Sequence, residues 1–117
     1  MTRDIKVGNK TVKMKASAAT PRLYRVEFNR DIFSDMQKMQ TAVEQSDENA
    51  SEIPVEMITT FENVAYIMAK QANEGKKFPK IDEWLDSFEM FNIYEALPQI
   101  IELWGENKAT ASNSKKK

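Results

Sequence analysis

Apolar and polar residues alternate near the start of the chain. Ile5 and Val7 alternate with a lysine before the pair Gly8-Asn9, and Val12, Met14 and Ala16 alternate with lysines after it. A period of two is typical of a strand with one buried face, and Gly-Asn tolerates the positive φ of a tight turn. Residues 3–16 are therefore predicted to form a β-hairpin. Its apolar face should lie on helices, because an isolated hairpin is only marginally stable.

From residue 20 onward the pattern takes the period of an α-helix. Thr20 suits the N-cap of a short first helix and Pro21 suits its first helical position. Asn29 suits a left-handed residue at the end of that helix, and Asp31 can cap a second helix of roughly three turns. The first helix has Leu23, Tyr24 and Phe28 at helical spacing, and the second has a stripe of Ile32, Phe33, Met36, Met39 and Val43.

The strongest helical pattern follows Pro54. Counted at about 100° per residue, six apolar side chains fall within about 100° of a helical wheel, while Glu62 and Lys70 lie opposite. These six are Met57, Phe61, Val64, Ala65, Met68 and Ala72. The pattern predicts a long amphipathic helix that ends near Gly75.

The stretch 81–107 reads IDEWLDSFEMFNIYEALPQIIELWGEN and contains 13 large apolar residues, both tryptophans and seven acidic residues, with no basic one. Its spacing predicts two helices, at 81–90 and 92–106, because Asn92 and Glu95 resemble a capping pair. Residues 108–117 are polar and are predicted to form a disordered tail.

These elements together predict a small α+β fold that is mainly α-helical. The hairpin at 3–16 is followed by a compact bundle of four to five helices within residues 20–107, and residues 1–107 form a single domain. The 117 residues are enough for one hydrophobic core. The chain has no apolar run long enough to span a bilayer, so no membrane contact is expected.

The composition argues against catalysis. The chain has no Cys and no His, which removes the commonest nucleophiles, general bases and metal ligands. Asp82 and Asp86 stand one helical turn apart, but no glycine-containing calcium loop accompanies them, so they are interpreted as part of a solvated acidic face. No enzyme activity, catalytic residue, cofactor or metal is predicted.

Charge is unevenly distributed along the chain. Residues 1–30 carry eight Lys and Arg against two acidic residues, whereas residues 31–68 carry one against eight. The basic and acidic segments could pair within the chain or between copies in a homo-oligomer, but the charges alone favour solvated helix faces and a basic hairpin. The basic segment is short and lacks a recognisable nucleic-acid motif, so no nucleic acid is expected as a partner.

The helix predicted at 92–106 has an apolar arc of about 180°, broader than the face of a helix that packs on one core. One interpretation is that it lies deep in the bundle and is covered on two sides. The other is that part of the arc binds a partner helix or another subunit, because exposed aromatic anchors dominate such interfaces. The second interpretation assigns partner binding to Tyr94, Leu103 and Trp104 on this arc, and the predicted site also includes Trp84, Phe88 and Phe91 from the preceding segment.

Three segments carry a family resemblance. RLYRVEFNRDIFSDMQKM, ENVAYIMAKQA and, above all, EWLDSFEMFNIYEALPQIIELWGEN followed by a lysine-ended tail resemble the tail assembly chaperones of long-tailed phages and prophages of Gram-positive bacteria. The resemblance covers roughly residues 3–117. One departure is Asn29, which occupies a turn where the family pattern has Gly, and Asn also tolerates the left-handed conformation.

The resemblance implies a non-enzymatic chaperone, the short form made before a programmed frameshift. It would bind the tape measure protein, keep it soluble and help the tail tube polymerise around it. The implied partners are the tape measure protein, the major tail tube protein and further copies of the chain. The implied location is the host bacterial cytoplasm, and not the mature virion. The alternative is a small helix-binding regulatory or interaction module without catalytic activity, encoded by a phage or by its host.

Overall fold

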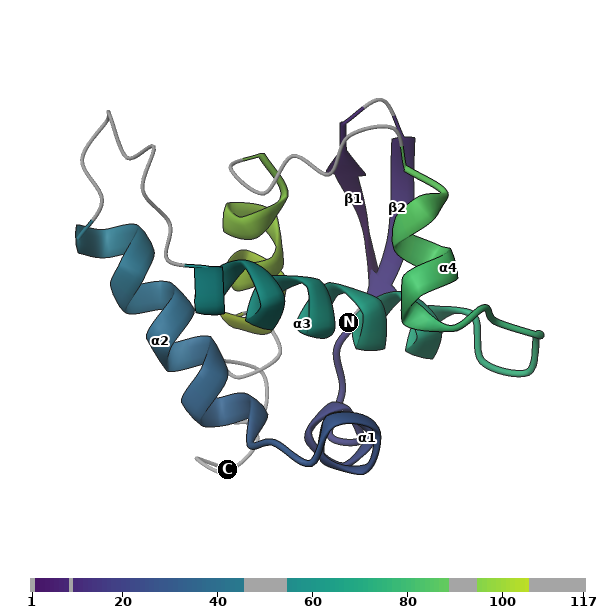
Figure 1. Cartoon of the computed structure of the whole chain (residues 1–117), viewed down its shortest axis with the longest axis horizontal. Coiled ribbons are helices and arrows are strands. Elements are labelled where there is room, and N and C mark those ends of the chain that lie inside the picture. Colours follow the sequence, from purple (N-terminus) through teal and green to yellow (C-terminus); the bar gives the residue numbers. More distant parts are fainter. Residues whose placement is uncertain (1, 9, 46–54, 89–94, 106–117) are drawn as a thin grey trace, which may run out of the picture.

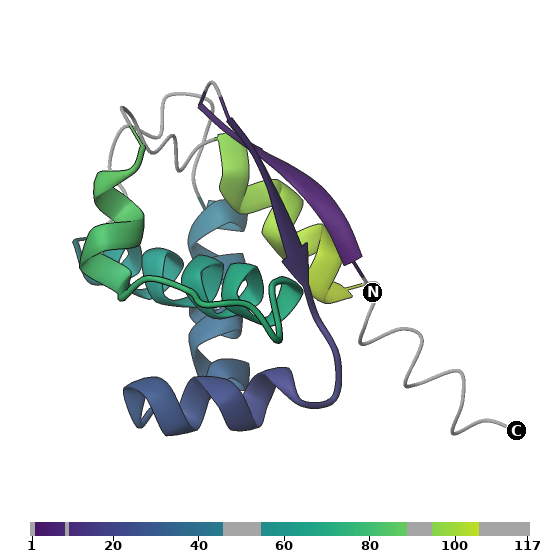
Figure 2. The same ribbon diagram turned by 90° about the vertical axis from the view of Figure 1, so that its right-hand side faces the viewer.

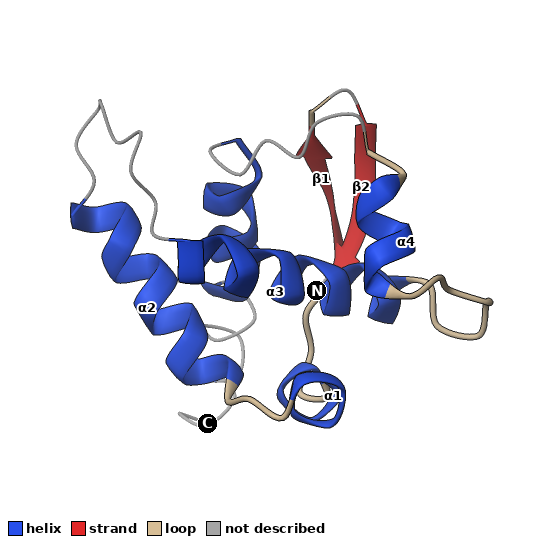
Figure 3. Ribbon diagram, in the orientation of Figure 1, coloured by secondary structure: helices blue, strands red, loops and turns tan. Residues whose placement is uncertain are grey.

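The computed structural model describes residues 2–8, 10–45, 55–88 and 95–105. It has the small α+β fold predicted from the sequence, with five helices and an N-terminal two-stranded hairpin in the described part of the chain (Figures 1 and 3). The elements are β1 (Thr2–Val7), β2 (Lys10–Lys15), α1 (Thr20–Phe28), α2 (Ile32–Gln45), α3 (Val55–Ala72), α4 (Ile81–Asp86) and a C-terminal helix at residues 95–105.

The predicted hairpin is confirmed. β1 and β2 pair antiparallel with Ile5 opposite Val12, and Gly8 in the turn has a φ of 61°. Ile5, Val7 and Met14 are fully buried, as the period of two requires. The hairpin packs on α3 and lies beside the C-terminal helix (Figure 2).

Helix α3 runs through the centre of the molecule and is contacted by β2, α1, α2 and α4 (Figure 1). The predicted stripe is buried at Phe61, Val64, Ala65 and Met68. Burial extends further than the stripe, because all six residues from 64 to 69 are buried. This part of α3, which is covered all round, is the centre of the hydrophobic core.

The prediction that Thr20 caps α1 is wrong. The N-cap is Ala19, and Thr20 is the first helical residue, with a buried side chain, so Pro21 is the second helical residue and not the first. Its hydroxyl accepts a hydrogen bond from the Ser17 N–H at 2.9 Å and donates one to Gln71 Oε1 at 2.7 Å. The buried Gln71 needs a polar partner, and this need places Thr20 inside the helix, facing α3.

Two other helix ends follow the sequence. Asn29 has the left-handed conformation with a φ of 55°, and Asp31 accepts a hydrogen bond from the Phe33 N–H at 3.0 Å at the start of α2. Helix α2 has 14 residues, so it is about one turn longer than predicted. Its stripe is buried at Ile32, Met36 and Met39, whereas Phe33 is 55% exposed, and the side chain of Val43 lies outside the described part of the chain.

The helix predicted at 81–90 ends earlier, at Asp86. The hydroxyl of Ser87 donates a hydrogen bond to the Trp84 carbonyl at 2.6 Å, and this local bond competes with continuation of the helix. Residues 89–94, including the predicted cap Asn92, and the predicted tail at 108–117 lie outside the described residues.

The corner between α1 and α2 is fixed by an ionic network around the buried carboxylate of Asp35. Arg30 donates two hydrogen bonds to the carboxylate of Asp35, at 2.8 and 2.9 Å, and the Tyr24 hydroxyl donates a third at 2.6 Å. Burial alone would raise the pKa of Asp35, but the hydrogen bonds from Arg30 and Tyr24 outweigh it and hold the pKa below its ordinary value. Burial and the neighbouring carboxylate raise the pKa of Tyr24, so it stays protonated.

Replacing Asp35 with Asn should therefore destabilise the fold by about 2 kcal/mol at neutral pH, because hydrogen bonds to a buried charge are lost. The charge of Arg30 remains solvated, since its side chain is 47% exposed. Urea unfolding measures the loss. The matched control is Asp31→Asn, which removes a charge from the same helix start but keeps an oxygen that can cap it.

The lowered pKa of Asp35 makes the stability of the fold depend on pH. A carboxyl whose pKa is lower in the folded state than in the unfolded state stabilises the fold above its unfolded pKa of about 3.9. That contribution is lost as the pH falls toward the folded pKa. The difference in unfolding free energy between the wild type and Asp35→Asn should shrink below about pH 4. An undiminished difference at pH 3 would contradict this role of Asp35.

Candidate partner-binding site

The predicted partner-binding residues lie mostly in the core. Leu103 is fully buried, and Trp84 and Trp104 are 6% and 7% exposed. Phe88 is partly buried and packs edge-on against Trp84, with ring centroids 5.0 Å apart. Phe91 and Tyr94 lie outside the described residues. Trp84, Leu103 and Trp104 are therefore not available as surface anchors in this fold, and the structure assigns them to packing.

The C-terminal helix contacts two neighbours, and most of the apolar arc is buried, at Ala96, Leu97, Ile100, Leu103 and Trp104. On one side Gln99 exchanges two hydrogen bonds with the backbone of Lys6 in β1, each 3.2 Å long. On the other side the Trp104 ring meets the Phe33 ring of α2 edge-on, with centroids 5.4 Å apart. For residues 95–105 the structure therefore agrees with the interpretation that this helix lies inside the bundle and is covered on two sides.

The exposed apolar surface lies elsewhere. Among the described residues four large apolar side chains are exposed: Leu23, Val26, Phe33 and Ile58. Leu23 and Val26 are 40% and 77% exposed and stand three residues apart on α1, so their side chains are neighbours on the helix surface. Both side chains add exposed apolar surface to α1.

Leu23 and Val26 border a groove of about 350 Å³, called the α1 groove from here on. The groove lies between α1, the C-terminal end of α3 and the turn at residues 73–78. Ile67 and Phe78 add apolar lining from α3 and from the end of the turn. Gly75 forms part of the turn with a φ of 87°, a backbone conformation that residues other than glycine rarely adopt.

The rim of the α1 groove carries both signs of charge. Glu27 of α1 and Lys70 of α3 form an ion pair of 3.2 Å across it, and Glu74 and Lys76 also line it. The Lys70 ammonium lies 5.8 Å from the centroid of the Tyr66 ring. An apolar strip between mixed charges suits an amphipathic ligand without strong charge preference.

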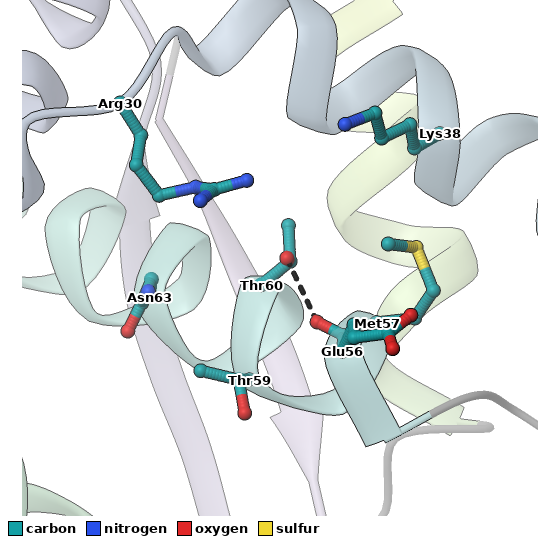
Figure 4. Close-up of a pocket in the computed structure, with 7 residues that line it drawn as sticks. All are labelled: Arg30, Lys38, Glu56, Met57, Thr59, Thr60 and Asn63. Atoms are coloured by element: carbon teal, nitrogen blue, oxygen red, sulfur yellow. Dashed lines mark hydrogen bonds between the residues drawn. The ribbon is translucent and has the colours of Figure 1, made fainter.

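A second groove of about 630 Å³ lies between α2 and α3 (Figure 4). It is lined by Arg30, Lys38, Glu56, Met57, Thr59, Thr60 and Asn63. Most of these groups are polar, and several already have partners. Arg30 is paired with Asp35, and the Thr60 hydroxyl donates to the Glu56 carbonyl at 2.9 Å. This groove offers less apolar surface than the α1 groove.

The described residues contain no group of three or more His, Cys, Asp or Glu that could hold a metal ion. Asp82 and Asp86 are both exposed on α4, as the predicted acidic face requires. None of the described helices has the length and apolar character needed to cross a membrane.

Comparison with protein-family models, with curated proteins and with solved structures gave no match to this chain.

The burial of Leu103 predicts how much stability is lost when its side chain is truncated. Leu103→Ala should lower the free energy of unfolding by about 2–5 kcal/mol, because it removes buried surface and leaves a cavity. Val26→Ala is the control, since a largely exposed side chain should change stability by less than about 0.5 kcal/mol. Urea titration compares the two variants. Equal, small effects would show that Leu103 is not part of the core.

Proposed function

We propose that this protein is a tail assembly chaperone that binds the helical tape measure protein through the α1 groove. The observation that carries the proposal is the pair Leu23 and Val26, exposed on α1 beside a groove with apolar lining. Both residues belong to the segment RLYRVEFNRDIFSDMQKM, which is one of the three that resemble this family. The resemblance and the exposed apolar surface thus coincide in one segment.

The geometry of the α1 groove suits a helix that lies across it. An amphipathic helix presents apolar side chains at spacings of three and four residues, and these insert into apolar grooves. A volume of about 350 Å³ accommodates a few side chains but not a whole helix. The partner helix would therefore rest on Leu23 and Val26 and insert side chains toward Ile67 and Phe78.

The remaining parts of the proposal rest on the resemblance. The protein acts without catalysis in the host bacterial cytoplasm, associates with further copies of itself and is released before the virion is complete. The major tail tube protein is a second partner in this scheme. The mixed charges around the α1 groove are compatible with many different amphipathic helices, which suits a long partner with repeated helical segments.

The competing function is a small regulatory module that binds a helix in the same α1 groove. The two functions differ in their gene neighbourhood. A chaperone gene should be followed by a second, overlapping frame, with a slippery heptamer near the codons for Lys115, Lys116 and Lys117, and then by a very long helical reading frame. Absence of all three features would favour the regulatory module.

Val26→Asp tests the binding site directly. An exposed Asp on α1 should leave the fold stable and weaken binding of the long helical protein encoded downstream by at least about tenfold, since it places a charge against apolar side chains. Binding is measured by titration calorimetry on purified segments of that protein.

The matched control is Ile58→Asp, which changes an exposed apolar residue near the opposite end of α3. It should leave binding within about twofold of the wild type. Unchanged binding by Val26→Asp, or an equal loss in the control, would rule out the α1 groove as the binding site.

A further inference from the structure

The two edges of the hairpin are covered differently. On the outer edge of β1, Gln99 accepts a hydrogen bond from the Lys6 N–H and donates one to the Lys6 carbonyl. Its amide therefore occupies the position of a neighbouring strand. Within the described part of the chain, nothing hydrogen-bonds to the backbone of β2 from the outer side. In Figure 2 the C-terminal helix lies behind the hairpin. Among the described residues the sheet has only β1 and β2, so the outer edge of β2 carries no further strand there. The start of β2 lies near the end of α4, where the Lys10 ammonium donates a hydrogen bond to the Ser87 carbonyl at 2.5 Å.

The register identifies the backbone groups at this edge. Val7 faces Lys10 across the two-residue turn, and such a pair exchanges both of its backbone hydrogen bonds. Alternation then turns the backbone of Lys6 outward, in agreement with its bonds to Gln99. By the same alternation the N–H and C=O groups of Thr11 and Lys13 point outward from β2. These are the groups with which an added strand pairs.

The positive charge of β2 favours one kind of added strand over others. Lys13 and Lys15 lie on one face of β2, and no ion pair holds either of them among the described residues. Lys10 alternates to the other face, and its ammonium donates to the Ser87 carbonyl and lies 5.2 Å from the centroid of the Phe88 ring. The one acidic side chain of the hairpin, Asp4, stands opposite Lys13. A second copy that paired through its own β2 would bring lysines beside lysines, which destabilises strand pairing. An acidic strand would instead be attracted.

We propose that the open edge of β2 binds an acidic peptide segment in extended conformation, which adds to the hairpin as a third strand. Its acidic side chains lie on the exposed face with Lys13 and Lys15. Its apolar side chains lie on the opposite face beside Val12, which is partly buried against the core. This inference concerns the hairpin alone and does not depend on the α1 groove or on the function proposed for it.

Nucleic acid fits this edge less well. The hairpin sequence contains no aromatic side chain on which a base could stack. The outward N–H and C=O groups alternate along β2, which matches a peptide backbone and not a row of phosphates. The lysines alone would not distinguish the two ligands, so the experiment includes both.

The test uses the whole chain and a fluorescent peptide of four Val-Glu repeats, followed by anisotropy at low ionic strength. Two variants probe different parts of the site. Thr11→Pro removes an outward N–H without removing a bond between β1 and β2, and Lys13→Glu reverses a charge at the edge. The matched control is Lys6→Glu, which reverses a charge on the same face of the hairpin but on β1.

Both Thr11→Pro and Lys13→Glu should weaken peptide binding by at least about tenfold, and Lys6→Glu by less than about threefold. Amide hydrogen exchange at Thr11 and Lys13 should slow when the peptide binds. A peptide of Val-Lys repeats should not bind. Circular dichroism and urea unfolding check that each variant is folded.

Three outcomes would overturn the proposal. The first is no binding of the acidic peptide to the wild type. The second is binding that Lys6→Glu weakens as much as Lys13→Glu while Thr11→Pro has no effect, since this would reflect diffuse charge attraction. The third is equal or tighter binding of oligothymidine, which would make the basic face a nucleic-acid surface.

Discussion

The fold depends on the burial of α3 along residues 64–69, where the helix is apolar all round. Because six consecutive residues of α3 are buried, the helix needs neighbours around its circumference, and the hairpin, α1, α2 and α4 all contact it. Each of these elements turns an apolar face inward to do so. Among the described residues only four large apolar side chains then stay exposed, and the two on α1, Leu23 and Val26, border the groove between α1 and the end of α3. The binding surface proposed here is thus a consequence of how the core is closed.

Burial of α3 also requires that its polar groups find partners. Gln71 accepts a hydrogen bond from Thr20 at 2.7 Å and donates one to Ser17 Oγ at 2.6 Å, and the Tyr66 hydroxyl donates to the Pro79 carbonyl at 2.7 Å. The first two bonds hold the start of α1 on α3, and the third holds the segment that leads into α4. These contacts fix two walls of the α1 groove, so the groove is formed before any partner arrives.

The sequence was sufficient for the local elements and insufficient for the surface. Alternation, caps and turns predicted the hairpin and the order of the helices, because these signals depend on nearby residues. A helical wheel gives the width of an apolar arc but not the number of elements that cover it. The wheel alone therefore allows Trp104 to be a surface anchor, whereas contacts with β1 and α2 bury the helix that carries it. The wheel of α1 has apolar residues on several sides, including Leu23, Tyr24 and Val26. Only the position of α3 decides which of them is exposed.

The small size of the exposed apolar surface bears on the function proposed for it. Two side chains beside a groove of about 350 Å³ support modest affinity for a single helical segment, because binding must first offset the loss of translational and rotational freedom. A long partner with repeated helical segments would bind several copies, and the total interaction would grow with their number. Each copy would still dissociate quickly by itself. Weak, repeated contacts suit a protein that must protect a long helix and then be displaced by subunits that polymerise around it.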